Sequence, residues 1–127
     1  MAQILVVDDD PAIRRLLTDV LELDGHEIRT AVDGLAAVRQ LEVLRPACVL
    51  LDVMMPGLDG YGVLRSIRSQ DGEPLPVIML TAAAEPDTAA RAWGEGVDYF
   101  LAKPFKADDL LELVDALVGD RLPVLRA

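Results

Sequence analysis

The segment Ala47–Gly60 has the sequence ACVLLDVMMPGLDG, in which a run of apolar residues leads into an acid and then into turn residues. The run is apolar without alternation, and this pattern predicts a strand that is buried on both faces. Asp52 then lies at the carboxyl end of the strand, where open α/β sheets place their ligand sites. A buried carboxylate is costly unless another group pairs with it. The rest of the chain should therefore supply partners for Asp52.

The composition is that of one soluble globular domain, with 127 residues, of which 52% are hydrophobic and 27% charged. The formal net charge of −10 argues against nucleic-acid binding, which needs a basic surface. No apolar run approaches the roughly 20 residues of a membrane span, and the N-terminus lacks the pattern of a signal peptide. We therefore expect a cytoplasmic protein without a membrane partner. The single cysteine, Cys48, is expected to be a core residue.

Short apolar runs alternate along the chain with segments that carry apolar residues at helical spacing. The expected strands span residues 3–7, 27–32, 47–52, 76–81 and 96–102. The expected helices begin at Pro11, Asp33-Gly34, Asp59-Gly60, Ala82 and just after Phe105, and they end at Gly25, before Pro46, before residue 70, at Gly94 and near Gly119. This alternation predicts an α/β fold, a doubly wound (βα)5 domain with a five-stranded parallel sheet. The domain would span residues 1–119, and residues 120–127 would form a short tail or the start of a linker.

Polar residues follow four of the expected strands, at the edge where all the carboxyl ends of a parallel sheet meet. They are Asp8-Asp9-Asp10, Asp52, Thr81 and Lys103. A hard divalent cation such as Mg²⁺ relieves the repulsion between crowded carboxylates. A cation, an ammonium group and a hydroxyl around a carboxylate suit a phosphoryl group. Asp10 is more simply explained as the N-cap of a helix that begins at Pro11.

The motifs in their order and spacing resemble the receiver domain of bacterial two-component response regulators, over roughly Gln3 to Val118. They are Ile4–Asp10, Asp52–Gly60, Met79–Ala82 and Tyr99–Phe105. The resemblance implies the strand order 2-1-3-4-5. It implies that Asp52 is the phosphoacceptor. Asp8, Asp9, Asp52 and the backbone carbonyl of Met54 would hold Mg²⁺, for which Mn²⁺ can substitute.

The resemblance also assigns roles to the residues that follow the last two strands. Thr81 and Lys103 match the hydroxyl and the lysine that contact the phosphoryl oxygens. Phe100 matches an aromatic residue that changes rotamer on activation and is often Tyr in the family, so together with Thr81 it would form the switch. The bond between Lys103 and Pro104 is cis in many relatives.

The function that the resemblance implies is a phosphorylation-activated signalling switch. A sensor histidine kinase or a phosphotransfer protein would donate the phosphoryl group. The face formed by the fourth helix, the fifth strand and the fifth helix would then change and control a downstream effector or a fused output domain. A phosphorylation-linked homodimer is a further expectation. The domain would not be an enzyme, beyond accepting phosphate from small donors and losing it slowly.

The lifetime of the phosphoryl group depends on two positions that flank the path of the hydrolytic water in the family. These are Met54 and Ala83, neither of which carries an amide or carboxylate. The sequence therefore predicts slow self-dephosphorylation.

Three other functions are less consistent with these residues. A Mg²⁺-dependent phosphohydrolase with an aspartate nucleophile would need an acid two residues past Asp52, where the chain has Met54. A flavin-binding electron carrier would need a loop that cradles phosphate where the chain has three aspartates. A partner-binding module without phosphate would not need the full set of site residues. His26, the only histidine, is predicted to be an exposed turn residue.

Overall fold

Five parallel strands alternate with five helices in the computed structural model, which describes residues 2–70, 74–81 and 86–118. The elements are β1 (Gln3–Val7), α1 (Pro11–Leu23), β2 (Glu27–Ala31), α2 (Gly34–Val43), β3 (Cys48–Asp52), α3 (Gly60–Arg68), β4 (Val77–Thr81), α4 (Pro86–Gly94), β5 (Tyr99–Ala102) and α5 (Ala107–Val118). The predicted tail at 120–127 lies outside the described residues. No helix in the described ranges has the length and apolar character that crossing a membrane requires.

The sheet has the strand order β2-β1-β3-β4-β5, which confirms the predicted doubly wound topology. β3 and β4, which pair with each other, are buried along their whole length, as their unbroken apolar runs predicted. The register pairs Asp52 with Leu80 and Thr81 with Ala102. Residues at the ends of neighbouring strands are thereby brought to one edge.

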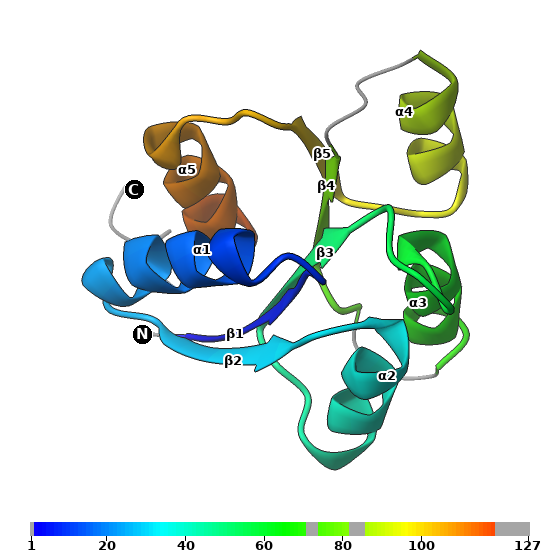
Figure 1. Cartoon of the computed structure of the whole chain (residues 1–127), viewed down its shortest axis with the longest axis horizontal. Coiled ribbons are helices and arrows are strands. Elements are labelled where there is room, and N and C mark those ends of the chain that lie inside the picture. The colour runs from blue at the N-terminus through cyan, green and yellow to red at the C-terminus, as the bar shows by residue number, and fades with distance from the viewer. Residues whose placement is uncertain (1, 71–73, 82–85, 119–127) are drawn as a thin grey trace.

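Helices cover both faces of the sheet (Figure 1), with α1 and α5 on one side and α2, α3 and α4 on the other. The core is accordingly split into two apolar clusters. The first joins the sheet to α1 and α5 through Leu17, Leu21, Leu110 and Val114. The second joins it to the other three helices, chiefly through α3.

Aspartate side chains cap three of the helices at their N-termini. The carboxylate oxygens of Asp10, Asp33 and Asp59 accept hydrogen bonds of 2.8 to 2.9 Å from backbone amides in the first turns of α1, α2 and α3. Pro11 occupies the first position of α1, where its missing N–H costs nothing. These starts agree with the sequence prediction.

The amino ends of β4 and β5 are tied together by one side chain, that of Arg68 at the end of α3. Its guanidinium donates to the carbonyl oxygens of Gly96 at 2.8 Å and Leu75 at 2.6 Å, and to Asp98 Oδ2 at 2.7 Å. The same Asp98 oxygen accepts from the Val77 amide at 2.8 Å. Arg68 therefore joins the end of α3 to the two loops that precede β4 and β5, at the edge opposite to the carboxyl ends.

The structure shortens four predicted strands, of which β3 and β4 each begin one residue later than predicted, at Cys48 and Val77. β5 begins at Tyr99 and not at Gly96, because Val97 donates its amide to Ala92 and closes the C-terminal end of α4. Gly96 has a φ of +93° there, which favours glycine. β2 ends at Ala31, and Val32 is half exposed. The predicted start of the fourth helix at Ala82 lies outside the described residues.

The prediction that His26 is an exposed turn residue is wrong, since its side chain is only 6% exposed. The turn between α1 and β2 folds against α5, and the imidazole lies in that contact. Its Nδ1 accepts a hydrogen bond of 3.3 Å from the Ala2 amide. The local sequence Gly25-His26 does not indicate this contact with a helix that lies far away in the chain.

Candidate functional site

The predicted site residues meet at the carboxyl edge of the sheet. Asp8 and Asp9 follow β1, Asp52 and Thr81 end β3 and β4, and Lys103 follows β5. From this edge the loops after β1 and β5 run to α1 and α5 on one face of the sheet, and the loop after β3 runs to α3 on the other face (Figure 1). Asp8, Asp52 and Thr81 are buried and Asp9 is exposed.

The Lys103 ammonium lies between two carboxylates. Its Nζ is 3.1 Å from Asp8 Oδ2 and 3.4 Å from Asp52 Oδ1. The Lys103 amide donates to the Thr81 carbonyl at 2.7 Å, which fixes the start of the lysine side chain. The Lys103–Pro104 peptide bond is cis. The structure thus brings Asp8, Asp52 and Lys103 into direct contact, as predicted from the sequence.

The loop after β1 holds Asp8 in place through two further contacts. The amide of Asp10 donates to Asp8 Oδ1 at 2.9 Å. Arg14 donates from Nη1 to the backbone carbonyl of Asp8 at 2.8 Å. Arg14 was not among the predicted site residues, because a bond to a backbone carbonyl has no charged partner that the sequence displays. Arg14 positions the backbone of Asp8 and does not reach the other carboxylates through any hydrogen bond among the described residues.

The backbone around Asp52 is fixed by the next loop. The Val53 amide donates to the Leu80 carbonyl, and the Gly60 amide donates to the Val53 carbonyl, both at 3.0 Å. A Cβ on Gly60 would collide with the carbonyl oxygen of Asp52 and lie 2.9 Å from Met79 Cε. Glycine at residue 60 therefore lets α3 start directly against the end of β3.

Burial raises the pKa of Asp52 to about 6, and the negative charge of Asp8 adds to this effect. The charge and hydrogen bond of Lys103 act in the opposite direction but do not cancel it. Burial by itself would lower the pKa of Lys103, but its hydrogen bond to Asp8 and the charges of Asp52 and Asp8 raise it. Near pH 7 most Asp52 is therefore ionised, and Lys103 is fully charged.

The carboxylates also form a suitable site for a cation. One oxygen each of Asp8, Asp9 and Asp52 lies within 4.8 Å of the others. An all-oxygen donor set with excess negative charge is what Mg²⁺ selects. The donors present therefore fit the metal that the sequence predicted.

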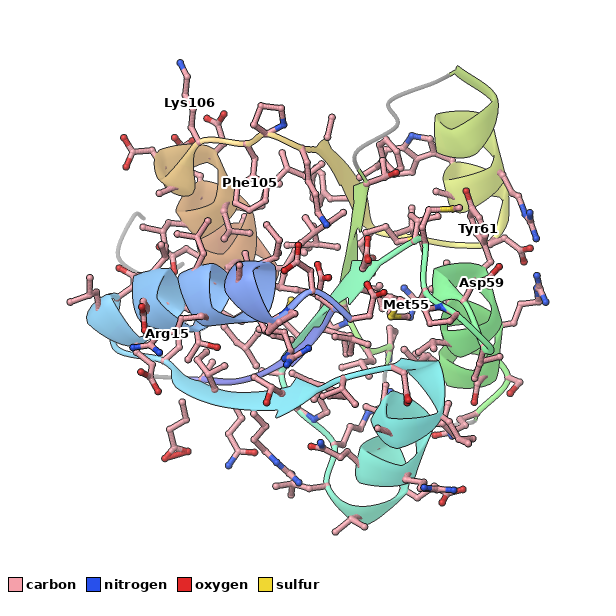
Figure 2. The ribbon with its side chains drawn as sticks, viewed as in Figure 1. Arg15, Met55, Asp59, Tyr61, Phe105 and Lys106 are labelled. Atoms are coloured by element: carbon pink, nitrogen blue, oxygen red, sulfur yellow. The ribbon has the colours of Figure 1, made fainter. Side chains whose placement is uncertain are left out.

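The two other predicted positions lie at the rim and flank of this edge. The Met54 side chain is exposed. Phe100 is partly buried and packs against the cluster on the α2–α3–α4 face of the sheet. Figure 2 shows Met55, Asp59 and Tyr61 on that same side, whereas Phe105 lies over the α5 side.

The sequence of residues 4–115 matches the family model of the response regulator receiver domain. The chain belongs to this family. The chain is also similar to curated response regulators and to solved structures of receiver domains.

Two curated regulators illustrate the relationship. The chain is 36% identical over 126 residues to the DNA-binding dual master transcriptional regulator RpaA of Synechocystis, with 97% of this chain and 52% of RpaA covered. It is 41% identical over 121 residues to the response regulator MprA of a Mycobacterium species, with 95% of this chain and 52% of MprA covered. The receiver domain described here spans about half the length of these relatives.

Solved receiver structures superpose closely on the chain. Chemotaxis protein CheY4 of Vibrio cholerae has a TM-score of 0.86 at 30% identity, covering 92% of this chain and 98% of CheY4. The receiver domain of the sensor histidine kinase PA1611 of Pseudomonas aeruginosa has a TM-score of 0.85 at 34% identity, covering 93% and 98%. The PA1611 structure has a magnesium ion coordinated in its active-site cleft.

Proposed function

We propose that this receiver domain is a phosphorylation-activated switch in which Asp52 accepts a phosphoryl group from a phosphohistidine. The observation that supports this most directly is the buried Asp52 carboxylate 3.4 Å from the Lys103 ammonium and beside two further acids. The donor would be a sensor histidine kinase or a phosphotransfer protein.

The transfer needs an ionised Asp52 and a means of holding the incoming negative charge. An Asp52 oxygen forms the new O–P bond while the N–P bond of the phosphohistidine breaks, and the imidazole keeps the electron pair and later takes a proton. Catalysis of such a step is mainly positioning and charge stabilisation. Lys103 neutralises part of the charge on the phosphoryl oxygens, and Thr81, one residue past the β4 partner of Asp52, donates its hydroxyl to them.

The cation site supports this chemistry. Asp8, Asp9 and Asp52 would hold Mg²⁺ or Mn²⁺, with the backbone carbonyl of Met54 as a further ligand. Bound Mg²⁺ would supply additional neutralisation of the phosphoryl oxygens. The same domain would accept phosphate from small donors and lose it slowly.

The output follows from a shift between two states. The phosphoryl group can favour the active state only through contacts that differ between the states. Movement of Thr81 toward the phosphoryl oxygens and a rotamer change of Phe100 on β5 would carry the shift to the α4–β5–α5 face. That face would act on a downstream effector or a fused output domain, or form a homodimer, within the cytoplasm.

The phosphohydrolase alternative lacks a supporting observation. The residue two past Asp52, where its general acid should stand, is Met54, whose thioether cannot give up a proton. The switch therefore remains the function that the site supports best.

The acceptor assignment predicts that Asp52→Asn abolishes phosphate uptake, because the amide is nearly the same size as the carboxylate but is not a nucleophile. Uptake would be measured by mass spectrometry of the intact protein after incubation with acetyl phosphate and Mg²⁺. Asp59→Asn is the matched control, since asparagine is an equally good N-cap for α3. Full labelling of the Asp52→Asn protein would place the acceptor elsewhere.

A further inference from the structure

A second group of metal-ligand side chains lies where the turn between α1 and β2 meets α5. Nε2 of His26 is 3.3 Å from Asp24 Oδ2 and 3.4 Å from Asp115 Oδ1. The three ligand atoms all lie within 4.8 Å of one another. The group belongs to the amino edge of the sheet and shares no residue with the acidic site around Asp52.

The imidazole of His26 is the part of this group that points to a missing ligand. Its side chain is 6% exposed, and Nε2 makes no hydrogen bond with any described residue. Buried polar atoms are almost always hydrogen-bonded or bound to a metal or water. Nε2 faces the two carboxylate oxygens, but neither contact has the alignment of a hydrogen bond.

The two separations between Nε2 and the carboxylate oxygens fit a cation placed between the three atoms. Bond lengths of Zn²⁺ to imidazole nitrogen and carboxylate oxygen, at tetrahedral angles, put neighbouring ligand atoms about 3.3–3.4 Å apart. A mixed nitrogen and oxygen donor set suits Zn²⁺, whereas Mg²⁺ prefers oxygen alone. Two carboxylates balance the charge of the ion. The Asp24 and Asp115 side chains are 34% and 39% exposed, so an ion can enter from solvent.

We propose that Asp24, His26 and Asp115 form a Zn²⁺-binding site that links α5 to the α1–β2 turn, with water as the fourth ligand. α1 and α5 already belong to the same apolar cluster, which contains Leu17, Leu21, Leu110 and Val114. The ion adds a polar link next to that cluster, close to the C-terminal end of α5.

Binding requires a defined movement of one proton. Nδ1 of His26 accepts from the Ala2 amide, so the neutral ring carries its proton on Nε2. Zn²⁺ takes the electron pair of Nε2, and the proton moves through water to Nδ1. The ring stays neutral, and the Ala2 amide loses its acceptor.

The test is a Zn²⁺ titration of the full chain by nuclear magnetic resonance with excess Mg²⁺ present to occupy the acidic site. Since the chain has one histidine, its ring nitrogen signals belong to His26 without further assignment. We expect saturation at one Zn²⁺ per chain, a change of the protonated nitrogen from Nε2 to Nδ1, and a shift of the Ala2 amide signal. Mg²⁺ alone should leave the ring signals unchanged.

Variants identify the ligands. Asp115→Asn should weaken Zn²⁺ binding by about 10- to 100-fold, the range of losses when even a supporting residue of a metal site is changed. Asp24→Asn, in the exposed turn, should do the same and covers the case in which Asp115→Asn does not fold. Asp19→Asn, at an exposed position of α1 paired only loosely with Arg15 at 3.9 Å, should bind as the wild type does.

Two results would overturn the zinc site. One is equal Zn²⁺ affinity in the wild type and in both ligand variants. The other is a ring that carries protons on both nitrogens and does not respond to Zn²⁺, because the two aspartates would then hold an imidazolium ion.

Discussion

Lys103 is one cation that faces two buried or nearly buried carboxylates, Asp8 and Asp52. The two carboxylates have different surroundings. Asp8 also accepts a hydrogen bond from the Asp10 amide, whereas burial raises the pKa of Asp52 to about 6. Asp8 is thus tied into the loop, and Asp52 keeps the reactive role proposed for it. The negative charge that Lys103 does not balance explains why the site suits a divalent cation.

Met54 tests the proposed lifetime of the phosphoryl group at the scale of one residue. Its side chain is 72% exposed beside the site and cannot orient a water molecule. Met54→Asn offers one hydrogen bond worth about 1 kcal/mol, which corresponds to roughly a fivefold faster loss of phosphate. The decay would be followed by phosphate release from protein labelled with acetyl phosphate.

Met54→Leu is the matched control, since it keeps an apolar side chain of similar volume. An unchanged decay rate in Met54→Asn, relative to Met54→Leu, would remove position 54 from the account of lifetime. The second position that the sequence singled out, Ala83, lies outside the described residues.

The position and contacts of a single residue could be predicted where they follow from the element to which it belongs. Asp8, Asp52 and Lys103 could be brought together because strand ends of a parallel sheet share one edge. His26 was wrongly predicted, because its burial depends on Asp115 of a helix about 90 positions later. Arg14 was missed because its bond to the Asp8 carbonyl involves no charged partner that a sequence pattern displays.

At the scale of elements, α4 is attached to α3 by polar contacts as well as by its apolar side. The Arg91 guanidinium lies 4.0 Å from the centroid of the Tyr61 ring, and Arg65 pairs with Glu95 at 3.1 Å. Tyr61 is the second residue of α3, next to the glycine that packs on Asp52. The start of α3 therefore contacts both the end of β3 and the fourth helix.

Gly60→Ala tests how closely α3 must approach β3. A methyl group there collides with the Asp52 carbonyl oxygen and crowds Val53 Cα at 2.9 Å. We expect the free energy of unfolding to fall by about 1–3 kcal/mol, the usual cost of overpacking. Urea denaturation followed by circular dichroism measures this change.

Gly94→Ala is the control substitution, at the end of α4, where an added Cβ meets no atom within 4 Å. Alanine is the better helix former, so stability there should stay the same or rise slightly. Equal stabilities of the two variants would show that the β3–α3 junction tolerates a side chain.

Element types were predictable, but some of their ends were not. Aspartate caps and the proline at residue 11 located three helix starts through local hydrogen bonding. The start of β5 could not be predicted, because Gly96 and Val97 complete the end of α4 through bonds to the Trp93 and Ala92 carbonyls. The α3–α4 contact of Tyr61 with Arg91 also had no local signal.

For the whole molecule, the ionised Asp52 at the site lowers the free energy of unfolding at neutral pH. Because the folded-state pKa of Asp52 is raised from 3.8 to about 6, folding favours the protonated form. The stability gained from protonation is complete below about pH 3.8 and is lost as the pH rises through about 6. Asp52 therefore destabilises the folded chain at neutral pH.

Asp52→Asn removes this ionisation and should raise the free energy of unfolding at pH 7 by about 1–3 kcal/mol. At pH 4 the gain should be much smaller, because Asp52 of the wild type is then protonated in the folded state. Urea titrations of both proteins at the two pH values, with a chelator present, provide the comparison. A gain that does not change with pH would assign the effect to packing and not to charge.

The bonds of Arg68 at the amino ends of β4 and β5 have a consequence for how such a domain can evolve. They secure a helix and two loops at the edge opposite to the proposed phosphorylation site. A substitution in a loop at the other edge, such as one at Met54, leaves these bonds of Arg68 in place. Substitutions that alter signal duration or partner choice can therefore arise at one edge without removing the bonds that hold the other.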